Sequence, residues 1–325
     1  MQAMIQTRRI VLALALSLFA FNALAQPAAK SEFQPEVGQA GKDVVWVPTA
    51  QGLVDRMLDM AKLTAKDIHY DLGSGDGRTV ITAAKRGATA YGVEYNPDMV
   101  ELSRRNAAAA GVSGKATFIH GDIFETDFSK ATVITLFLLP DLNVKLRPTI
   151  LNMKPGTRVI SNSFTMGDWK SDETQGAKGE CTSYCTAYMW IVPAKVEGVW
   201  KSGNEEIKLA QEYQMVQGSV NSGGKLSNVQ GGRLRGDEIS FTAGDARYAG
   251  KVNGNRIEAV LLNSHDGSTA FELGFGLYRL ACANGLVVRT ATVGSVRLVH
   301  SGLNLDNVFT AARSLVDRAP QVAET

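Results

Sequence analysis

The sequence predicts an α/β protein with a doubly wound sheet, followed by a small antiparallel β extension and a terminal helix. An apolar segment at 67–70 ends in a loop with three glycines, and residues 79–86 then carry the apolar face of a helix. A later segment, 131–139, is apolar on both faces, as a central parallel strand must be. From about Glu197 the chain changes to short alternating segments separated by Gly and Asn, which is typical of an antiparallel meander.

Residues 1–25 have the three parts of a secretory signal peptide. Arg8 and Arg9 form the charged region, residues 10–21 the apolar region, and Ala23-Leu24-Ala25 a small-residue cleavage site. About a dozen apolar residues fall short of the roughly twenty that are needed to cross a bilayer. We therefore expect cleavage after Ala25, no transmembrane anchor after cleavage, and an exported, periplasmic protein.

The segment 26–43 is rich in Pro, Ala and polar residues and has no periodicity, so it is predicted to be a flexible lead. The first folded domain is expected to span 44–194. Its first helix should begin after Thr49, because apolar residues follow at helical spacing up to Ala61, and threonine is a suitable N-cap. This helix is expected to pack near the glycine loop.

The loop at 71–78 is predicted to hold a ligand. Its glycines at 73, 75 and 77 permit positive φ and let a ligand lie against bare backbone. A dinucleotide-binding fingerprint would need Gly or Ala where Arg78 stands, so a pyrophosphate is disfavoured. Asp71 ends the preceding strand, and its anion favours a cationic group such as an amine or a sulfonium. Asp76 is equally consistent with a helix N-cap and with a residue that faces the ligand.

Two further strands are each followed by an acid. The strand at 92–94 ends in Glu94, about twenty residues after the loop, where a carboxylate can accept from both hydroxyls of a ribose. The strand at 116–120 leads to Asp122, which could accept from the exocyclic amine of adenine. Three successive strand ends therefore present an acid.

The rest of the first domain continues the alternation of helices and strands. Asn96-Pro97 supplies an N-cap and a proline suited to the first helical position, and the helix should end at Gly111. Strands are expected at 158–164 and 184–192. The segment 166–180 is polar and irregular, and no element is predicted in it.

The pattern resembles the class I S-adenosylmethionine-dependent methyltransferases over residues 44–194. It is most similar to the lysine methyltransferases of the ATP synthase c-subunit type and their exported bacterial relatives. That likeness rests on five motifs: Val47-Pro48-Thr49, the loop at 71–78, Gly92-Val93-Glu94-Tyr95-Asn96-Pro97, Leu136-Phe137-Leu138-Leu139-Pro140-Asp141, and Lys154-Pro155-Gly156-Thr157-Arg158-Val159. One departure is Ala50, where those relatives usually have proline, so the entry loop is expected to be looser here.

This resemblance implies a Rossmann-like methyltransferase sheet, with S-adenosyl-L-methionine as the cofactor. By the same resemblance the methionine part lies near Asp71 and the glycine loop, the ribose near Glu94 and the adenine near Asp122. The implied cofactor-binding residues are Thr49, Asp71, Gly73, Ser74, Gly75, Glu94 and Asp122.

The acceptor implied by the resemblance is a lysine side chain of a protein. A methyl transfer is an in-line displacement, so the protein mainly has to align two reactants and exclude water, which leaves little trace in the sequence. Asp141, Asn162, Tyr184 and Tyr188 are near the predicted strand tips and could assist, but no general base is assigned. Lys+Arg 34 against Asp+Glu 32 provides no field for a polyanion, so no nucleic-acid partner is expected.

Two other functions remain open. The domain could be a binding module or sensor that keeps the cofactor pocket without turnover, because export separates the protein from the cytoplasm where this cofactor is made. It could also be a nucleotide-dependent oxidoreductase, which Asp71 and Arg78 disfavour. Nothing in the sequence indicates the oligomeric state.

The three cysteines are Cys181, Cys185 and Cys282. An exported chain could close Cys181 to Cys185 and leave the third free. Packed or free thiols are nevertheless the expected state. No metal site is predicted, because no histidine stands at ligand spacing from the cysteines.

The second half of the chain is predicted to form two segments. Residues 195–262 are a β-meander in which the pattern at 232–239 recurs at 250–257 as a similar hairpin. This meander is either an appended sheet without chemistry or a domain that grips the substrate. Residues 263–325 should form a hairpin that turns at Asn284-Gly285, a further strand and a final helix, and they resemble part of a phage- and plasmid-borne family of unknown function. Whether this last segment is a native part of the protein remains open.

Overall fold

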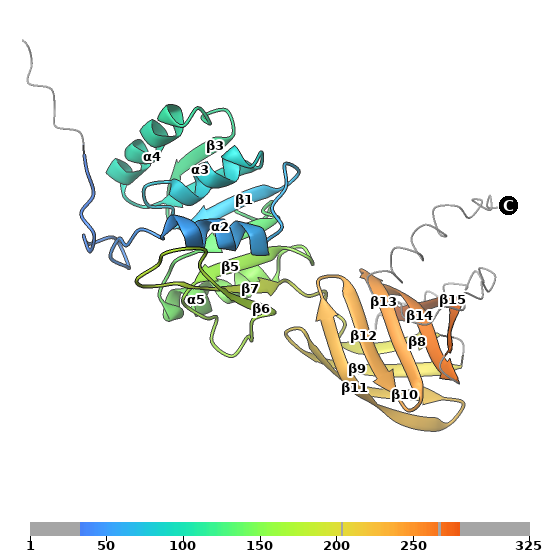
Figure 1. Cartoon of the computed structure of the whole chain (residues 1–325). Coiled ribbons are helices and arrows are strands. Elements are labelled where there is room, and N and C mark those ends of the chain that lie inside the picture. Colours follow the sequence, from blue (N-terminus) through green and yellow to red (C-terminus); the bar gives the residue numbers. More distant parts are fainter. Residues whose placement is uncertain (1–32, 203, 266–267, 280–325) are drawn as a thin grey trace, which may run out of the picture. The chain divides into compact units, whose positions relative to one another are not determined.

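The computed structural model describes residues 33–202, 204–265 and 268–279 (Figure 1). The chain divides after Glu36 into a short unit and a large one, and the elements below belong to the large unit. Within the described residues, no helix is both long and apolar enough to span a membrane. The predicted signal peptide at 1–25 and the hairpin turn, strand and final helix predicted beyond residue 279 lie outside the described residues.

The first domain contains a seven-stranded sheet in the order β3-β2-β1-β4-β5-β7-β6. The first five strands along the chain are parallel, whereas β7 is antiparallel to both β5 and β6. Their bounds are β1 Ile68–Leu72, β2 Thr89–Glu94, β3 Ala116–His120, β4 Val133–Leu136, β5 Arg158–Asn162, β6 Glu173–Gly176 and β7 Thr186–Ile191. The strand order reverses between β1 and β4, which opens a crevice at the carboxyl ends of the parallel strands. The predicted doubly wound sheet is therefore confirmed.

Four helices cover the two faces of this sheet (Figure 1). Apolar side chains of α2, α3 and α4 pack against one face, and those of α5 pack in a separate core on the other face. Their bounds are α2 Gln51–Met60, α3 Arg78–Lys85, α4 Pro97–Ala109 and α5 Pro140–Leu151.

The helix starts only partly follow the prediction. The Asn96 side chain caps α4 by accepting from the backbone N–H groups of Asp98 and Met99, as expected. The N-cap of α2 is Ala50, without a side-chain cap, so the prediction of a Thr49 cap was wrong. The N-cap of α3 is Gly77 at φ +82°, so Asp76 does not hold that position.

Two elements of the first domain were not predicted. Helix α5 begins at Pro140, which suits the first helical position, and contains Pro148, whose missing N–H removes one helical hydrogen bond. Pro148 is tolerated because it lies on the exposed side of the helix, where water can satisfy the carbonyl that lacks a helical N–H partner. Strand β6 is a short polar strand at the edge of the sheet, with alternating exposed residues.

The second domain is a closed antiparallel barrel, in which each strand pairs with the next along the chain. Its strands are β8 Gly198–Ser202, β9 Glu205–Glu212, β10 Met215–Ser222, β11 Lys225–Arg235, β12 Glu238–Ala243, β13 Ala246–Asn253, β14 Arg256–His265 and β15 Ser268–Arg279. The barrel closes where Tyr278 and Arg279 of β15 pair with Lys201 and Trp200 of β8. The antiparallel meander is thus confirmed, but its closure was not predicted, and β14 runs across the boundary expected after residue 262.

Candidate active site

A cavity of about 380 Å³ lies at the carboxyl ends of the parallel strands, within the roughly 300–1,000 Å³ usual for small-molecule sites. It is bounded by the loops after β1, β2, β3 and β4 and by the segment that precedes α2. All the residues expected to bind the cofactor line this one cavity: Thr49, Asp71, Gly73, Ser74, Gly75, Glu94 and Asp122.

The glycine loop between β1 and α3 is held tightly against its neighbours. Gly73 and Gly75 have φ of +82° and +53°, which favour glycine. A Cβ on Gly75 would stand only 2.6 Å from Nε1 of Trp46. The N–H groups of Gly73 and Ser74 both donate to the carbonyl of Val93, at 2.9 and 3.0 Å, so the loop is anchored to β2. Both glycines therefore serve the turn, and Gly75 also permits the close approach of Trp46.

Asp71 lies at the floor of the cavity and is only 7% exposed. The Thr135 hydroxyl on β4 donates to its Oδ1 at 2.6 Å. Burial raises the pKa of Asp71 to about 7; the Thr135 and Thr79 hydroxyls lower it, and the carboxylates of Asp76 and Glu94 raise it further. Near neutral pH this carboxyl can therefore be held as an anion by a small favourable interaction with a cation.

His69 stands behind Asp71 on the same face of β1 and is fully buried. Its Nε2 lies 2.8 Å from Oγ1 of Thr135, and since that hydroxyl gives its proton to Asp71, we assign the Nε2 proton to His69 as donor. Burial lowers the pKa of His69 to about 3, so the imidazole is neutral. His69 thus orients the threonine that orients Asp71, a role that the sequence did not suggest.

Glu94 closes the neighbouring part of the cavity at the end of β2. Its Oε2 accepts from the N–H of Gly75 and its Oε1 from the N–H of Asn96, both at 2.9 Å. Each oxygen keeps a further lone pair for a donor in the cavity. Ser74 adds a buried hydroxyl that has no partner within the described part of the chain, so the site contains an unused polar group beside the glycines.

Arg78, whose presence disfavours a pyrophosphate, ties the loop to the entrance of α2. Its guanidinium pairs with Asp76 at 2.7 Å and donates to the carbonyl of Thr49 at 2.9 Å. Asp76 therefore faces an arginine in this structure. The acid and the base at this end of the loop therefore pair with each other.

A hairpin before α2 forms a wall of the cavity that the sequence did not predict. Trp46 and Gly38 are joined by a backbone hydrogen bond of 2.8 Å, and Ala40 bridges to Val45. Residues 39–43, expected in the flexible lead, line the cavity together with the following residues. At the tip, Lys42 forms an ion pair with Asp122, and this contact lowers the pKa of the Asp122 carboxyl.

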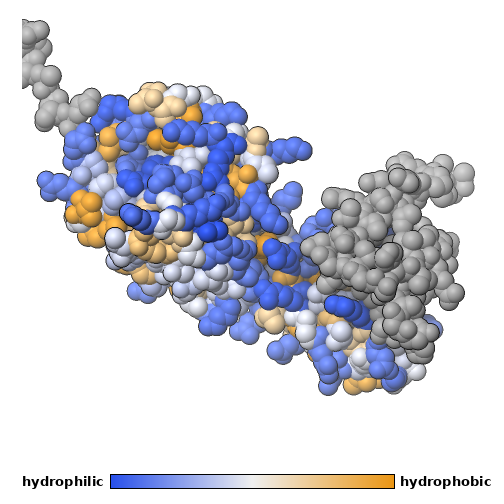
Figure 2. Space-filling view, viewed as in Figure 1, coloured by the Kyte–Doolittle hydropathy of each residue, from blue (hydrophilic) through white to orange (hydrophobic). Residues whose placement is uncertain are grey.

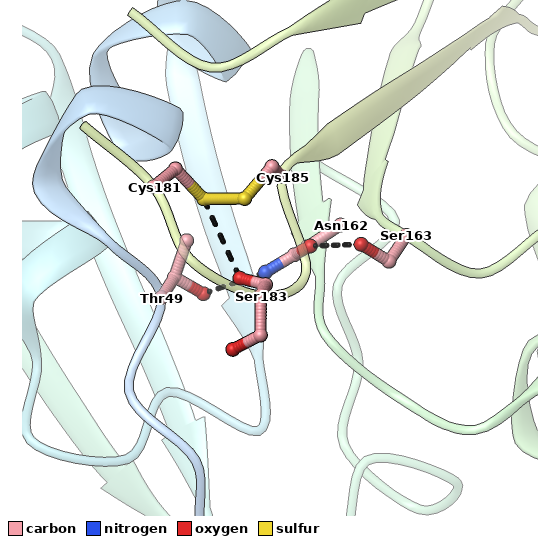
Figure 3. The surroundings of a disulfide bond; sticks show 6 residues. All are labelled: Thr49, Asn162, Ser163, Cys181, Ser183 and Cys185. Atoms are coloured by element: carbon pink, nitrogen blue, oxygen red, sulfur yellow. Dashed lines mark hydrogen bonds between the residues drawn. A yellow bond between two sulfur atoms is a disulfide. The ribbon is translucent and has the colours of Figure 1, made fainter. Parts of the chain in front are cut away.

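The residues considered as aids to catalysis are only partly brought together. Tyr184 lines the cavity, whereas Asp141 in α5 and Tyr188 in β7 are not among its lining residues. Asn162 is fully buried beside the lining and donates to Oγ1 of Thr49 at 3.2 Å. Its Oδ1 accepts from the Ser163 hydroxyl at 2.8 Å, so its carboxamide is fixed between two hydroxyls (Figure 3).

Cys181 and Cys185 form a disulfide beside the same group of residues (Figure 3). The expectation of packed or free thiols was wrong for this pair, and Cys282 lies outside the described residues. Sγ of Cys181 also lies 3.4 Å from the carbonyl of Ser183, a contact without a proton because the sulfur is oxidised. No group of three or more potential ligands within the described ranges could hold a metal ion.

Comparison with known proteins identifies the two halves of the chain separately. Residues 71–173 match the ANTKMT methyltransferase domain, and residues 207–325 match a domain of unknown function, DUF932. The second match confirms the resemblance of the C-terminal part to a family of unknown function. It begins within β9, so it includes most of the barrel.

Individual relatives match the first half. A protein-lysine N-methyltransferase of Saccharolobus islandicus is 41% identical over 152 residues, which are 46% of this chain and 94% of that protein. The Mus musculus lysine N-methyltransferase of the ATP synthase c-subunit is 36% identical over 132 residues, which are 40% of this chain and 53% of that protein. A solved RNA methyltransferase from Salinibacter ruber in complex with S-adenosyl-L-homocysteine is 47% identical, with a TM-score of 0.43, and the match covers 46% of this chain and 96% of that one.

The matched family consists of methyltransferases, and the site suits the methyl donor of such enzymes. Acids at the ends of β1 and β2, a glycine loop and an unpaired serine hydroxyl suit a ligand that carries an ammonium group and a ribose. That ligand is S-adenosyl-L-methionine. Through the segment that builds the seven-stranded sheet, the chain belongs to the family of S-adenosylmethionine-dependent methyltransferases that the Saccharolobus islandicus protein-lysine N-methyltransferase represents.

Proposed function

We propose that this protein transfers the methyl group of S-adenosylmethionine to the side-chain amine of a lysine in another protein. The observation that carries the proposal is that acids at the carboxyl ends of β1, β2 and β3 line one side of a cavity whose other side opens at the tips of β4 and β5. One side is suited to the cofactor. The other is left for the acceptor.

The order of the strands orients the cofactor in this proposal. The methionine ammonium group lies at Asp71, and the backbone of Gly73 and Gly75 approaches the methionine part. The ribose hydroxyls donate to the free lone pairs of Glu94, and the adenine lies near Asp122 on the far side of β2. The ammonium group stabilises the ionised form of Asp71, whose pKa of about 7 in the free protein leaves it only partly ionised at neutral pH.

The transfer itself is one in-line displacement. The amine lone pair forms the new N–C bond as the C–S bond breaks, and the sulfur keeps the electron pair of that bond. The lysine must lose one proton to water to expose this lone pair, and no side chain is assigned to accept it. The chain's task is to hold the two reactants in line within a site from which water is excluded.

The mouth of the cavity suits a protein acceptor. Large hydrophobic side chains rarely stay exposed without cause in such numbers, yet Val45, Tyr95, Leu139 and Tyr184 all line this cavity and are at least 44% exposed. Figure 2 shows hydrophobic residues gathered in clusters on the visible surface of this domain. The nearly balanced charge of the chain, +2, gives no support for a nucleic-acid acceptor.

Export to the periplasm is part of the proposal. The signal peptide expected at residues 1–25 supports it, and so does the Cys181–Cys185 disulfide, because such bridges persist in oxidising compartments. The acceptor is then an envelope protein.

The test uses the full chain without residues 1–25, a methyl-labelled cofactor and an envelope extract that contains both protein and RNA. We expect label in material that is sensitive to protease and resistant to ribonuclease, with methyl-lysine found by mass spectrometry. Label removed by ribonuclease would instead show an RNA acceptor, as in the name of the Salinibacter ruber relative. Tight cofactor binding without any transfer would indicate the sensor.

A further inference from the structure

The far half of the cavity is walled by three aromatic rings. Phe137 follows β4, Phe164 follows β5 and Tyr184 precedes β7, and all three line the cavity. Their ring centroids lie 5.2 to 6.1 Å apart, with Tyr184 set edge-on to Phe137. Phe137 and Phe164 are half-buried and Tyr184 is 44% exposed, so the rings form a continuous wall that still meets solvent.

The order of the sheet places this wall next to the reacting end of the cofactor. Across β3, β2, β1, β4, β5 and β7 the cavity meets in turn Asp122, Glu94, Asp71, Phe137, Phe164 and Tyr184. The three acids on one side correspond to the adenine, ribose and methionine parts of the proposed cofactor position. An acceptor that approaches the sulfonium from beyond Asp71 therefore has to pass the three rings.

The half of the cavity beyond Asp71 has no acid of its own. The acidic residues of the lining all belong to the hairpin before α2 or to β1, β2 and β3 and the loops that follow these strands: Asp43, Asp71, Asp76, Glu94 and Asp122. A charged amine in the far half can thus be met only by ring faces, hydroxyls and backbone carbonyls. Aromatic faces attract ammonium groups within about 6 Å of the ring centroid, and they also pack against the methylene stem of a lysine.

Tyr184 is held in this wall with an unfavourable backbone conformation. Its φ is +55°, which is strained for any residue with a Cβ, and Ser163 beside it has φ +58°. The Cys181–Cys185 disulfide closes a loop around Tyr184, and the N–H of Ala177 donates to the Cys185 carbonyl at 2.8 Å.

The loop that carries Tyr184 is also tied to α2, and the strand that follows this loop is tied to the segment after β5. The N–H of Lys178 donates to the carbonyl of Gly52 at 3.1 Å, and a Cβ on Gly52 would fall 1.8 Å from the Lys178 carbonyl oxygen. The N–H of Ser163 donates to the carbonyl of Thr186 at 2.7 Å. A strained residue with an exposed ring, in a loop that a disulfide closes and a hydrogen bond ties to α2, is expected where the ring has a function.

From these contacts we infer that Phe137, Phe164 and Tyr184 form the subsite that receives the ammonium-bearing side chain of the acceptor, and that the Cys181–Cys185 bridge positions Tyr184 in it. The inference rests on the proposed lysine acceptor and names the chain's own residues for it. Tyr184 and the two phenylalanines would touch the acceptor, whereas the cysteines act only through Tyr184.

The test measures binding without turnover. Protein saturated with S-adenosylhomocysteine is titrated with N-acetyl-lysine-methylamide, and the probe is followed by NMR through the ring-current shift of its ε-methylene protons. The matched probe, N-acetyl-norleucine-methylamide, keeps the apolar stem and lacks the amine. We expect the lysine probe to shift on binding and the norleucine probe to bind roughly 10-fold more weakly or not at all.

Variants then assign the effect to the ring and to the bridge. Tyr184→Ala should weaken the lysine probe roughly 3- to 30-fold, Tyr184→Phe should restore the affinity, and both should leave the affinity for S-adenosylhomocysteine unchanged. The double change Cys181→Ser and Cys185→Ser should weaken the probe as Tyr184→Ala does, while Cys282→Ser controls for the loss of a cysteine elsewhere. A cooperative unfolding transition above the assay temperature checks that each variant is folded, because loss of the disulfide is itself expected to lower the melting temperature.

The outcomes distinguish this inference from the proposed function. Wild-type affinity in Tyr184→Ala, equal binding of the norleucine probe, or no binding of the lysine probe to the wild type would each overturn the subsite. If the probe binds as expected and yet no protein lysine is methylated in an envelope extract, the proposed function fails while the ammonium subsite stands.

Discussion

Asp71→Asn should separate the charge of the cofactor pocket from its shape. Asparagine has the same size, and its carbonyl oxygen can still accept from the Thr135 hydroxyl that now lies 2.6 Å from Oδ1. The loop that follows is held by other contacts, from Gly73 and Ser74 to the carbonyl of Val93, so it should keep its position. Only the anion that faces the cofactor's ammonium group is removed.

The expected loss of affinity follows from the burial of this carboxyl. A charge-assisted hydrogen bond to a buried group contributes about 1.5 to 3 kcal/mol, which corresponds to roughly 10- to 150-fold in Kd. S-adenosylmethionine and S-adenosylhomocysteine share the ammonium group and should weaken together. Adenosine lacks the amino-acid part and should bind nearly as it does to the wild type.

The pH dependence gives a second, independent measurement. The carboxyl has a pKa of about 7 in the folded free protein, so below that pH it is protonated and cannot attract the ammonium group. The affinity of the wild type for the cofactor should therefore fall as pH drops. At pH 6 it should be roughly 10-fold below its value with the carboxyl fully ionised, and at lower pH it should approach the affinity of Asp71→Asn. The variant should show no such fall between pH 5.5 and 7.5, a window chosen because an α-amino group itself loses its proton near about pH 8.

With rising pH, the stability of the folded protein should change in the opposite direction to its affinity for the cofactor. The folded-state pKa of Asp71 is raised from 3.8 to about 7, so the folded protein binds more protons than the unfolded chain between these values. Its free energy of unfolding should therefore decrease as pH rises through this window, by on the order of 4 kcal/mol from this group, and then stay level. Asp71→Asn lacks this contribution and should become more stable relative to the wild type as pH rises.

Isothermal titration calorimetry with the three ligands and chemical denaturation across the pH range measure these effects. If adenosine weakened as much as the full cofactor, Asp71 would be holding the loop rather than the ligand. If the wild type and the variant shared one pH profile, the carboxyl would not be the group that titrates.

The remaining predictions concern the neighbouring acid and the second domain. Glu94→Ala should weaken the binding of S-adenosylmethionine roughly 30- to 1000-fold, because two ribose hydroxyls lose their acceptor. The loss of affinity should be smaller in Glu94→Gln. If calorimetry showed that both variants bind as the wild type does, the ribose assignment would be contradicted. A chain truncated after Ala194 should stay soluble and bind the cofactor, because the Saccharolobus islandicus relative is matched over 94% of its length by the first domain. The truncation should lower the free energy of unfolding by about 1 to 3 kcal/mol, since the Trp169 indole loses its acceptor Gln214. Truncation after Val260 should instead aggregate, as it opens the barrel and exposes strand edges, and equal solubility of the two chains by gel filtration would refute that reasoning.

The cofactor half of the site could be predicted because its signals are local and the sheet assembles them. Asp71 is the last residue but one of β1, Glu94 ends β2, and Asp122 follows β3. Parallel strands end at one edge of a sheet, so the topology alone brings these acids together. The cap at Asn96-Pro97 could be predicted for the same reason, since both its parts are adjacent in the sequence.

The features that were missed depend on contacts between distant parts of the chain. Helix α5 continues through Pro148 because Leu146 and Ile150 are buried in the core, and packing outweighs local preference. The hairpin at 38–46 is fixed by Lys42 pairing with Asp122 and by Trp46 closing over Gly75, neither of which leaves a local pattern. The barrel closes only when β15 pairs with β8, and no periodicity within either strand predicts that partner.

The aromatic wall of Phe137, Phe164 and Tyr184 is another feature that the sequence did not predict, and the reason is physical. A cofactor common to many enzymes is recognised through backbone turns and strand-end acids, and those must keep a fixed spacing along the chain. The acceptor meets Phe137, Phe164 and Tyr184, which come from three separate connections and have no spacing to keep. Tyr184 moreover needs a left-handed backbone that a disulfide encloses, so its place in the wall depends on two cysteines that a search for catalytic patterns would set aside. We therefore expect substitutions in these connections to change the specificity of the enzyme for its acceptor without changing its cofactor binding.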